Sequence, residues 1–384
     1  MMLEARMKRR ILFASIALGV AGLALATPVR LAGQAAQTYS PPRLPDGRPD
    51  LQGTYDLATL TPLERPDGMK AVLTADEVAK IQRAVAAQIA LGNRPSSADR
   101  AAPPKGGDGS RGAAGNVGGY NSFWLDPGST YTMVNGEART SLVIDPPDGR
   151  LPPLKPAARQ RLGALLARPS AENDPGLDPT PGAYDNPERR PLGERCLLGF
   201  GSAAGPPALP NYFYNNLRKI VQTPDRVLIL NEMVHDVRVV RMNAQHLPPH
   251  IRKWAGDSVG RWEGDTLVVD TTNFNADQIR YVVNAAPGRT LMMVESIGAK
   301  EQDRLNGPGK DLHVIERFSR VANNALLYRF TVDDPGTWER PWTGEFTWPI
   351  TDQPIYEYAC HEANYALENI LRGARQRDAE AAKK

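Results

Sequence analysis

Residues 256–274 read GDSVGRWEGDTLVVDTTNF, and this stretch decides the fold class. Gly264-Asp265 separates two strand-like runs, and a two-residue loop with glycine is typical of a tight β-hairpin, because glycine adopts a positive φ at little cost. The second run is apolar from Leu267 to Val269 and is then interrupted by Asp270 and Asn273. Because a buried polar side chain needs a hydrogen-bond partner, we expect both residues to have specific partners.

Similar short runs extend the pattern on both sides of the hairpin. The runs predicted as strands are 219–222, 226–234, 237–242, 260–263, 266–274, 312–321, 325–332 and 343–348. Turn residues separate most of them, as in an antiparallel meander. The sequence therefore predicts a mainly β protein, in which an antiparallel meander forms a lipocalin-like barrel or curled sheet with a few peripheral helices.

The remaining segments suggest four regions. Residues 1–26 read as a signal peptide, 27–195 as an N-terminal wrapping region, 196–375 as the antiparallel β domain with a C-terminal helix, and 376–384 as a charged tail. Within the wrapping region, the capping box Thr74–Glu77 starts a helix that ends at Gly92, and Asn135-Gly136 predicts a hairpin. Residues 93–119 are rich in Gly and Pro and are expected to form a mobile linker.

The N-terminus predicts export, because Lys8, Arg9 and Arg10 precede the apolar run from Ile11 to Ala26, as in a signal peptide. Cleavage is expected after Ala26, with a second site after Ala35 and an uncleaved anchor as alternatives. We therefore expect a periplasmic or secreted protein, with a membrane contact only through the export signal.

Cys196 and Cys360 are the two cysteines, and an oxidising compartment favours a disulfide between them. The alternative is two unpaired buried thiols.

The charge distribution bears on the partner. The 46 basic and 43 acidic residues are spread along the chain, without the basic face that a nucleic-acid binder requires. We expect a small-molecule ligand or substrate, no nucleic acid and no cofactor. The oligomeric state is not predicted.

Several long motifs resemble a family of exported bacterial proteins of unassigned function. The motifs are HDVRVV, GDSVGRWEGDTLVVDTTNF, TVDDPGTWERPWT and IYEYACHE, and the resemblance covers most of the chain after the export signal. It implies export and a common fold, and it carries over no catalytic residue.

Four residues are candidates for acid–base chemistry: His235, Asp270, His361 and Glu362. His235 lies between two strands, where a side chain can point into a barrel mouth, and a carboxylate such as Asp270 or Glu362 can orient it as a general base. The alternative is a histidine bonded to a neighbouring carbonyl. His361 and Glu362 follow Cys360, where a disulfide would hold them rigidly. The alternative is that Glu362 favours a helix N-terminus through the dipole.

Aromatic and basic residues are candidates for substrate binding. They are Arg238, Trp262, Trp338, Trp342, Tyr356 and Tyr358. The alternative is that the tryptophans pack in the core. No metal is expected, because the spacing of His246 and His250 is interrupted by two prolines; His235, His246 and His250 are the alternative ligands.

These observations favour an exported hydrolase or lyase that uses histidine and carboxylate groups on a small organic or sugar-derived substrate. The alternatives are a lipocalin-like periplasmic binding protein without catalysis, a metal-dependent hydrolase, and a structural envelope protein.

Overall fold

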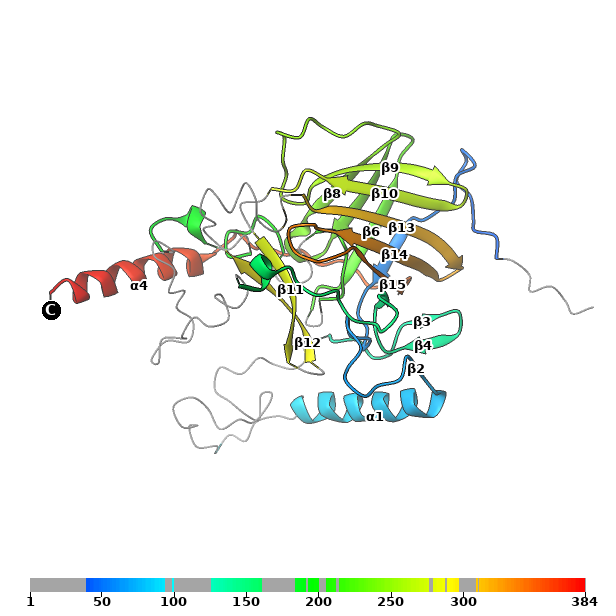
Figure 1. Ribbon diagram of the computed structural model, residues 1–384, viewed down its shortest axis with the longest axis horizontal. Helices are drawn as coiled ribbons and strands as arrows, with labels where there is room; N and C mark the ends of the chain where they lie inside the picture. Colours follow the sequence, from blue (N-terminus) through cyan, green and yellow to red (C-terminus); the bar gives the residue numbers. More distant parts are fainter. Residues whose placement is uncertain are drawn as a thin grey trace, which may run out of the picture. The chain divides into compact units, whose positions relative to one another are not determined.

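The computed structural model of the chain describes residues 39–93, 99, 126–160, 184–190, 193–199, 205–211, 214–275, 279–286, 289–296, 309 and 311–383. Between 279 and 296 only the backbone is described. The predicted signal peptide lies outside these residues, as does almost all of the predicted linker. The predicted fold class is confirmed: the protein is mainly β and is built on a curled, half-barrel sheet (Figure 1).

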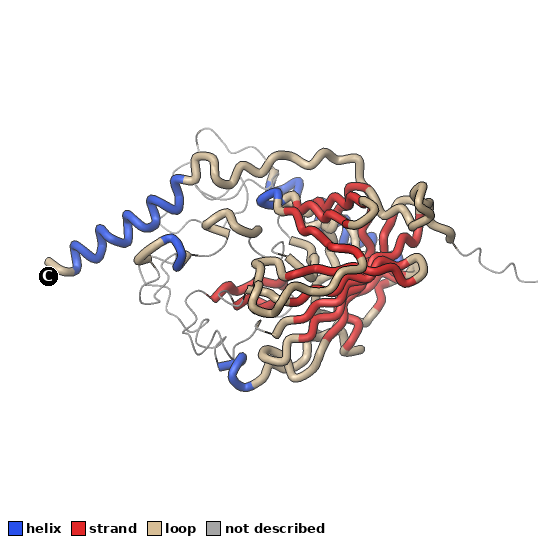
Figure 2. Tube along the Cα trace, turned by 90° about the horizontal axis from the view of Figure 1, so that it is seen from above, coloured by secondary structure: helices blue, strands red, loops and turns tan. Residues whose placement is uncertain are grey.

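Within the described residues, ten strands form this sheet in the order β1-β6-β7-β8-β9-β10-β13-β14-β15-β5. Their bounds are β1 Gly53–Asp56, β5 Val143–Asp145, β6 Leu217–Gln222, β7 Arg226–Asn231, β8 Val237–Met242, β9 Asp257–Glu263, β10 Thr266–Thr272, β13 His313–Ala322, β14 Ala325–Asp333 and β15 Trp342–Pro349. Figure 2 shows these strands gathered in one body. The predicted strands agree with β6 to β10 and β13 to β15, with small differences at their ends.

The hairpin of the opening stretch is formed by β9 and β10. Leu267 faces Trp262 in the antiparallel register, and Gly264 has a φ of 58°. The positive φ is the one that the two-residue loop requires.

One pair departs from the predicted antiparallel meander, because β8 and β9 run parallel. Two parallel strands begin at the same end of the sheet. After β8 the chain therefore has to cross back along the sheet before β9 can pair with it. Residues 243–256 make this crossing, and we call them the crossover segment. The prediction missed it because strand periodicity does not reveal strand direction.

The two edge strands of the sheet, β1 and β5, come from the region predicted to wrap the body. An isolated bridge joins Tyr55 of β1 to Ile350, just after β15. The lead-in before β1 is also attached, because the side chain of Gln222 accepts from Leu51 N at 2.6 Å and donates to Pro49 O at 3.1 Å. The N-terminal region therefore belongs to the same sheet.

The inner face of the curled sheet is aromatic. Phe318, Tyr328, Phe330, Phe346 and Trp348 are fully buried there, and the rings of Tyr328 and Trp348 lie 4.5 Å apart. Side chains of a strand alternate between faces, so the intervening positions form an outer face. This alternation separates an apolar core from a polar outer surface.

Smaller elements surround the sheet. They are α1 Ala75–Gly92, β2 Val72–Leu73, β3 Met133–Val134, β4 Glu137–Arg139, η2 Pro187–Arg189, η4 Met233–His235, β11 Ile279–Ala286, β12 Arg289–Ser296 and α4 Tyr365–Ala381. The capping box of α1 and the hairpin β3–β4 are present as predicted. Helix α4 is longer than predicted and includes most of the charged tail.

Candidate functional site

The alternation of β10 and β13 places Asp270 and His313 together on the outer face. Leu267 and Val269 of β10 point into the core, so Asp270 points away from it. Asp270 faces Ile315 in the register, which makes His313 its diagonal neighbour on the same face. The Nε2 atom of His313 lies 2.8 Å from Asp270 Oδ1.

The crossover segment brings a second histidine to the same carboxylate. His246 Nε2 lies 3.1 Å from Asp270 Oδ1, and its Nδ1 lies 3.2 Å from Asp257 Oδ2. The backbone of Leu247 donates to Asp257 at 2.9 Å and accepts from the side chain of Asn273 at 2.8 Å. These bonds hold the crossover segment against the start of β9 and the end of β10.

Asp257 is the anchor of this arrangement. Its side chain is 1% exposed and also pairs with Arg241 at 2.8 Å and Lys253 at 3.2 Å. Burial would raise the pKa of Asp257, but the backbone bond from Leu247 and the bonds from Lys253 and His246 outweigh it and lower the pKa. The carboxylate therefore stays ionised and fixes His246.

Asp270 and His313 shift each other's pKa values. The hydrogen bond to Asp270 raises the pKa of His313 above its ordinary value, against the effect of burial. Burial would raise the pKa of Asp270, but the bonds and charges of His313 and His246 lower it. Near neutral pH Asp270 is therefore a carboxylate, and it stabilises the protonated form of His313 relative to a free imidazole.

The chemistry available to Asp270 and His313 depends on which of their side-chain atoms are not already hydrogen-bonded. Within the described part of the chain, Asp270 Oδ2 and His313 Nδ1 have no hydrogen-bond partner, and the side chains are 27% and 38% exposed. A carboxylate that holds one imidazole nitrogen leaves the other free to take a proton. We call His313, Asp270, His246 and Asp257 the outer-face cluster.

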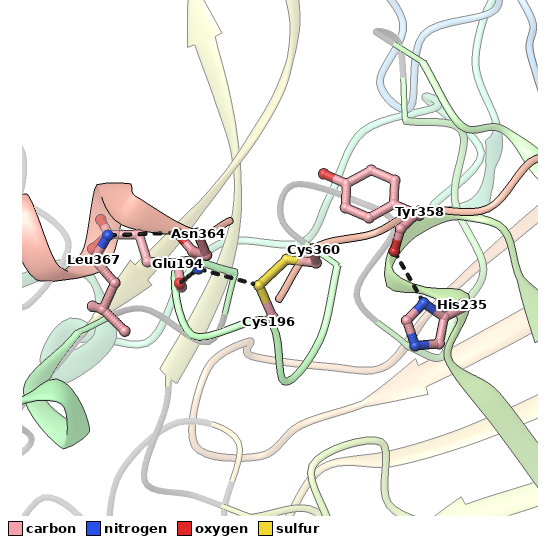
Figure 3. The surroundings of a disulfide bond; sticks show 7 residues. All are labelled: Glu194, Cys196, His235, Tyr358, Cys360, Asn364 and Leu367. Atoms are coloured by element: carbon pink, nitrogen blue, oxygen red, sulfur yellow. Dashed lines mark hydrogen bonds between the residues drawn. A yellow bond between two sulfur atoms is a disulfide. The ribbon is translucent and has the colours of Figure 1, made fainter. Parts of the chain in front are cut away.

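Asp270, a residue predicted as catalytic, thus joins His246 and His313, and not His235. His235 ends η4 and has a φ of 44°. Its Nδ1 lies 3.1 Å from the carbonyl oxygen of Tyr358 (Figure 3). This contact matches the structural alternative considered for His235.

His361 and Glu362 are exposed and follow the predicted disulfide, which is present between Cys196 and Cys360 with an S–S distance of 2.03 Å (Figure 3). The side chain of Asn364 caps α4 by accepting from Leu367 N, and donates to Glu194 O at 3.1 Å.

A cavity of about 400 Å³ lies between the disulfide and α4. Glu357, Tyr358 and Leu367 are among its lining residues.

The residues predicted to bind substrate are dispersed. Trp338 and Trp342 are buried in the core, and Trp262 packs against it. Tyr356 is 71% exposed, whereas Tyr358 lines the cavity beside α4. The guanidinium of the remaining residue, Arg238, points to the inner face, where it pairs with the buried carboxylate of Glu316.

The structure does not join His235, His246 and His250 into a metal site. His235 contacts Tyr358, His246 lies between two aspartates, and His250 is exposed. Among the described residues, no group of three or more His, Cys, Asp or Glu side chains is arranged to hold a metal ion.

Sequence reasoning missed His313 and Asp257 as parts of one site. The available signal was the alternation in 313–318, which puts His313 on the face opposite to the apolar Val314 and Phe318. The contact of His313 with Asp270 could not be inferred from the sequence, because a long segment separates β10 from β13.

None of the helices in the described part of the chain is both long enough and apolar enough to cross a bilayer. Comparisons with protein-family models, with curated proteins and with solved structures find no match to this chain.

Proposed function

We propose that the protein is an acid–base enzyme of hydrolase or lyase type, in which His313 is the general base and Asp270 orients it. The observation that carries this proposal is the contact of 2.8 Å between His313 Nε2 and Asp270 Oδ1, while no described residue bonds to His313 Nδ1. An imidazole held in this way presents a fixed lone pair to a substrate.

The chemistry needs only this chain's own residues. In the neutral form, His313 donates its Nε2 proton to Asp270 and accepts a proton at Nδ1. In a hydrolase the proton comes from water, whose oxygen attacks the substrate while His313 returns the proton to the leaving group. In a lyase the proton that His313 accepts comes from the carbon next to a carboxylate of the substrate, and the leaving group departs from the adjacent carbon.

His246 and Asp257 act as positioning residues. His246 bridges Asp270 and Asp257, so the carboxylate of Asp270 has a second contact beside that with His313. Arg241 and the half-exposed Lys253 add positive charge beside the cluster. Both cations pair with Asp257, and the exposed part of the Lys253 ammonium would bind an anionic substrate, such as a sugar acid or another small organic acid.

Export is part of this proposal. The disulfide Cys196–Cys360 and the apolar N-terminal run after Lys8, Arg9 and Arg10 both fit a periplasmic or secreted enzyme.

The test is turnover of a panel of aryl esters and uronic-acid oligosaccharides by the purified exported protein. His313→Gln and Asp270→Asn are expected to lower kcat by about 10²–10⁴-fold. Glu263→Gln is the matched control, because it also changes an outward-facing carboxylate to an amide but lies outside the cluster. A substrate turned over equally well by His313→Gln would refute the proposal.

A second candidate function is favoured by the cavity of about 400 Å³ beside α4. Its volume is that of a small-molecule site, and Tyr358 gives it an aromatic wall. A binding protein without catalysis would retain a ligand there. Native mass spectrometry of the exported protein would detect a co-purified ligand, and loss of that ligand in Leu367→Trp would place it in this cavity.

A further inference from the structure

A second polar site lies on the inner face of the sheet, apart from the outer-face cluster. Here the inward positions of β6, β7 and β8 surround a cavity of about 30 Å³. The residues that line it are Gly205, Ala208, Arg218, Ile229, Asn231, Asp236, Arg238 and Ala255. Three of them have small side chains, which leaves room in front of the two arginines.

Arg218 is the unusual member of this set, because it is a buried cation that forms no ion pair with any described residue. Its side chain is 3% exposed, and Nη1 donates to the carbonyl oxygens of Asn215 at 3.4 Å and Leu217 at 3.0 Å. Within the described part of the chain, nothing accepts from its Nε and Nη2 atoms, and no carboxylate lies within ion-pair distance. Burial lowers the pKa of Arg218 to about 10, so it remains charged at neutral pH.

The nearby carboxylates are engaged elsewhere. Glu316 receives both terminal nitrogens of Arg238 and also the hydroxyl of Tyr328 at 2.8 Å. Glu232 accepts from Leu217 N at 3.2 Å, and burial raises its pKa. Its charge acts on Arg218, but it forms no ion pair with the guanidinium within the described residues.

Asp236 also lines the cavity and acts on the buried arginine through its charge. It is partly exposed and has contacts of its own, so it is not a free counter-ion for Arg218. Burial of a charge without a hydrogen-bonded counter-ion costs free energy. The Nε and Nη2 atoms of the guanidinium are therefore suited to bind an anion.

We propose that this cavity binds the carboxylate group of a small organic acid. A planar carboxylate matches two parallel N–H groups of a guanidinium, here those of Nε and Nη2. The size agrees, because one water requires about 10–15 Å³ and the cavity therefore holds about two or three non-hydrogen atoms. A tetrahedral sulfate or phosphate has five.

The site is independent of the proposed catalysis, since it lies on the other face of the sheet and shares no residue with the outer-face cluster.

The experiment is a calorimetric titration of the purified exported protein with sodium acetate, in a carboxylate-free buffer with chloride at matched ionic strength. Arg218→Met keeps the shape of the buried stem and removes the guanidinium. Lys219→Met is the matched control, because it removes a cation from the neighbouring, outward-facing position of β6. Thermal melting with and without acetate measures the Tm of each variant and shows whether it is folded.

We expect saturable acetate binding in the wild type and in Lys219→Met, and binding at least about tenfold weaker in Arg218→Met. Acetate should raise the Tm of the first two proteins only. Absence of saturable binding to the wild type would overturn the proposal whether or not Arg218→Met folds. Unchanged affinity in a folded Arg218→Met would overturn it too, and equal affinity for sulfate would refute the preference for a carboxylate.

Discussion

At Asp270 two imidazoles share one carboxylate oxygen, at 2.8 Å for His313 and 3.1 Å for His246. Each histidine has a different second contact. His246 bridges to the buried Asp257, whereas no second hydrogen bond is formed by His313 within the described residues. Two similar side chains therefore differ in role because one is held at both ring nitrogens and the other at one.

Replacement of Asp270 tests this coupling directly. In Asp270→Asn the hydrogen bond that His313 donates to an ionised carboxylate, the main cause of its raised pKa, is lost. We expect the pKa of His313 to fall, and the rising limb of any pH–rate profile to move to lower pH. The measurement is an NMR titration of the histidine ring protons. An unchanged pKa of His313 would show that Asp270 does not control it.

The pH dependence of stability is a second test at this scale. The pKa of His313 is raised by folding, so its contribution is complete below about pH 6.5 and is lost as pH rises through the folded value. The pKa values of Asp270 and Asp257 are lowered, so their contributions are present above about pH 4 and are lost as pH falls through the folded values.

We therefore expect the wild type to exceed His313→Gln in stability most clearly between about pH 4 and 6.5. Urea unfolding of both proteins across this range measures the difference. A difference that grows above pH 7 would contradict the assigned direction.

At the scale of elements, the parallel pair β8–β9 is the feature that builds the site. The crossover segment 243–256 returns over the sheet and carries His246 to β9 and β10. Asn273 closes this arrangement after β10, with a φ of 57° and a side-chain bond to Leu247 O. Asparagine tolerates the left-handed conformation better than most residues.

Substitution of Asn273 separates its two roles. Asn273→Gly keeps the left-handed conformation and loses the bond to Leu247, whereas Asn273→Ala loses both. We expect losses in the free energy of unfolding of about 1 kcal/mol for Gly and about 2 kcal/mol for Ala. Urea midpoints give the order, and equal values would show that backbone conformation at this position is unimportant.

At the scale of the whole molecule, the chain's distant parts are joined in one sheet and by one disulfide. Strands β1 and β5 enclose the later strands, and Cys196–Cys360 links residues 164 positions apart. Long-range pairing of this kind is costly in chain entropy until many contacts form together. Cross-linking the chain offsets part of that cost.

Removal of the disulfide should therefore lower stability substantially. In the chain-entropy model, a loop of this length contributes up to about 5 kcal/mol. We expect Cys196→Ser/Cys360→Ser to unfold at lower urea concentration than the wild type, and the wild type with a reductant to approach the double variant. Identical midpoints for the oxidised and reduced proteins would contradict this expectation.

Much of the fold was predictable because it depends on local pattern. Period-two alternation and turn residues predicted β8, β10, β13 and β14 closely, and the capping box predicted the start of α1. The pairing of Cys196 with Cys360 was also predicted and is confirmed, since these are the two cysteines of the chain. These features depend on neighbouring residues or on simple counting.

The site was predicted only in part. Asp270 and Asn273 were recognised as polar residues that need partners, and the structure supplies them. The identity of those partners depended on strand direction and register. His235 was chosen as the histidine partner for Asp270, whereas the parallel crossover and the β10–β13 pairing bring His246 and His313.

The sequence by itself thus determined the β class, the hairpin at Gly264-Asp265 and the need of Asp270 for a partner, because each follows from side-chain chemistry and local backbone geometry. Tertiary structure alone decided that β9 runs parallel to β8 and that His313 meets Asp270. It also decided that Arg218 is buried and forms no ion pair with a carboxylate in the part of the chain that the structure describes. The physical reason is that these contacts join residues far apart in the chain, and their choice depends on how all strands bury their apolar faces together.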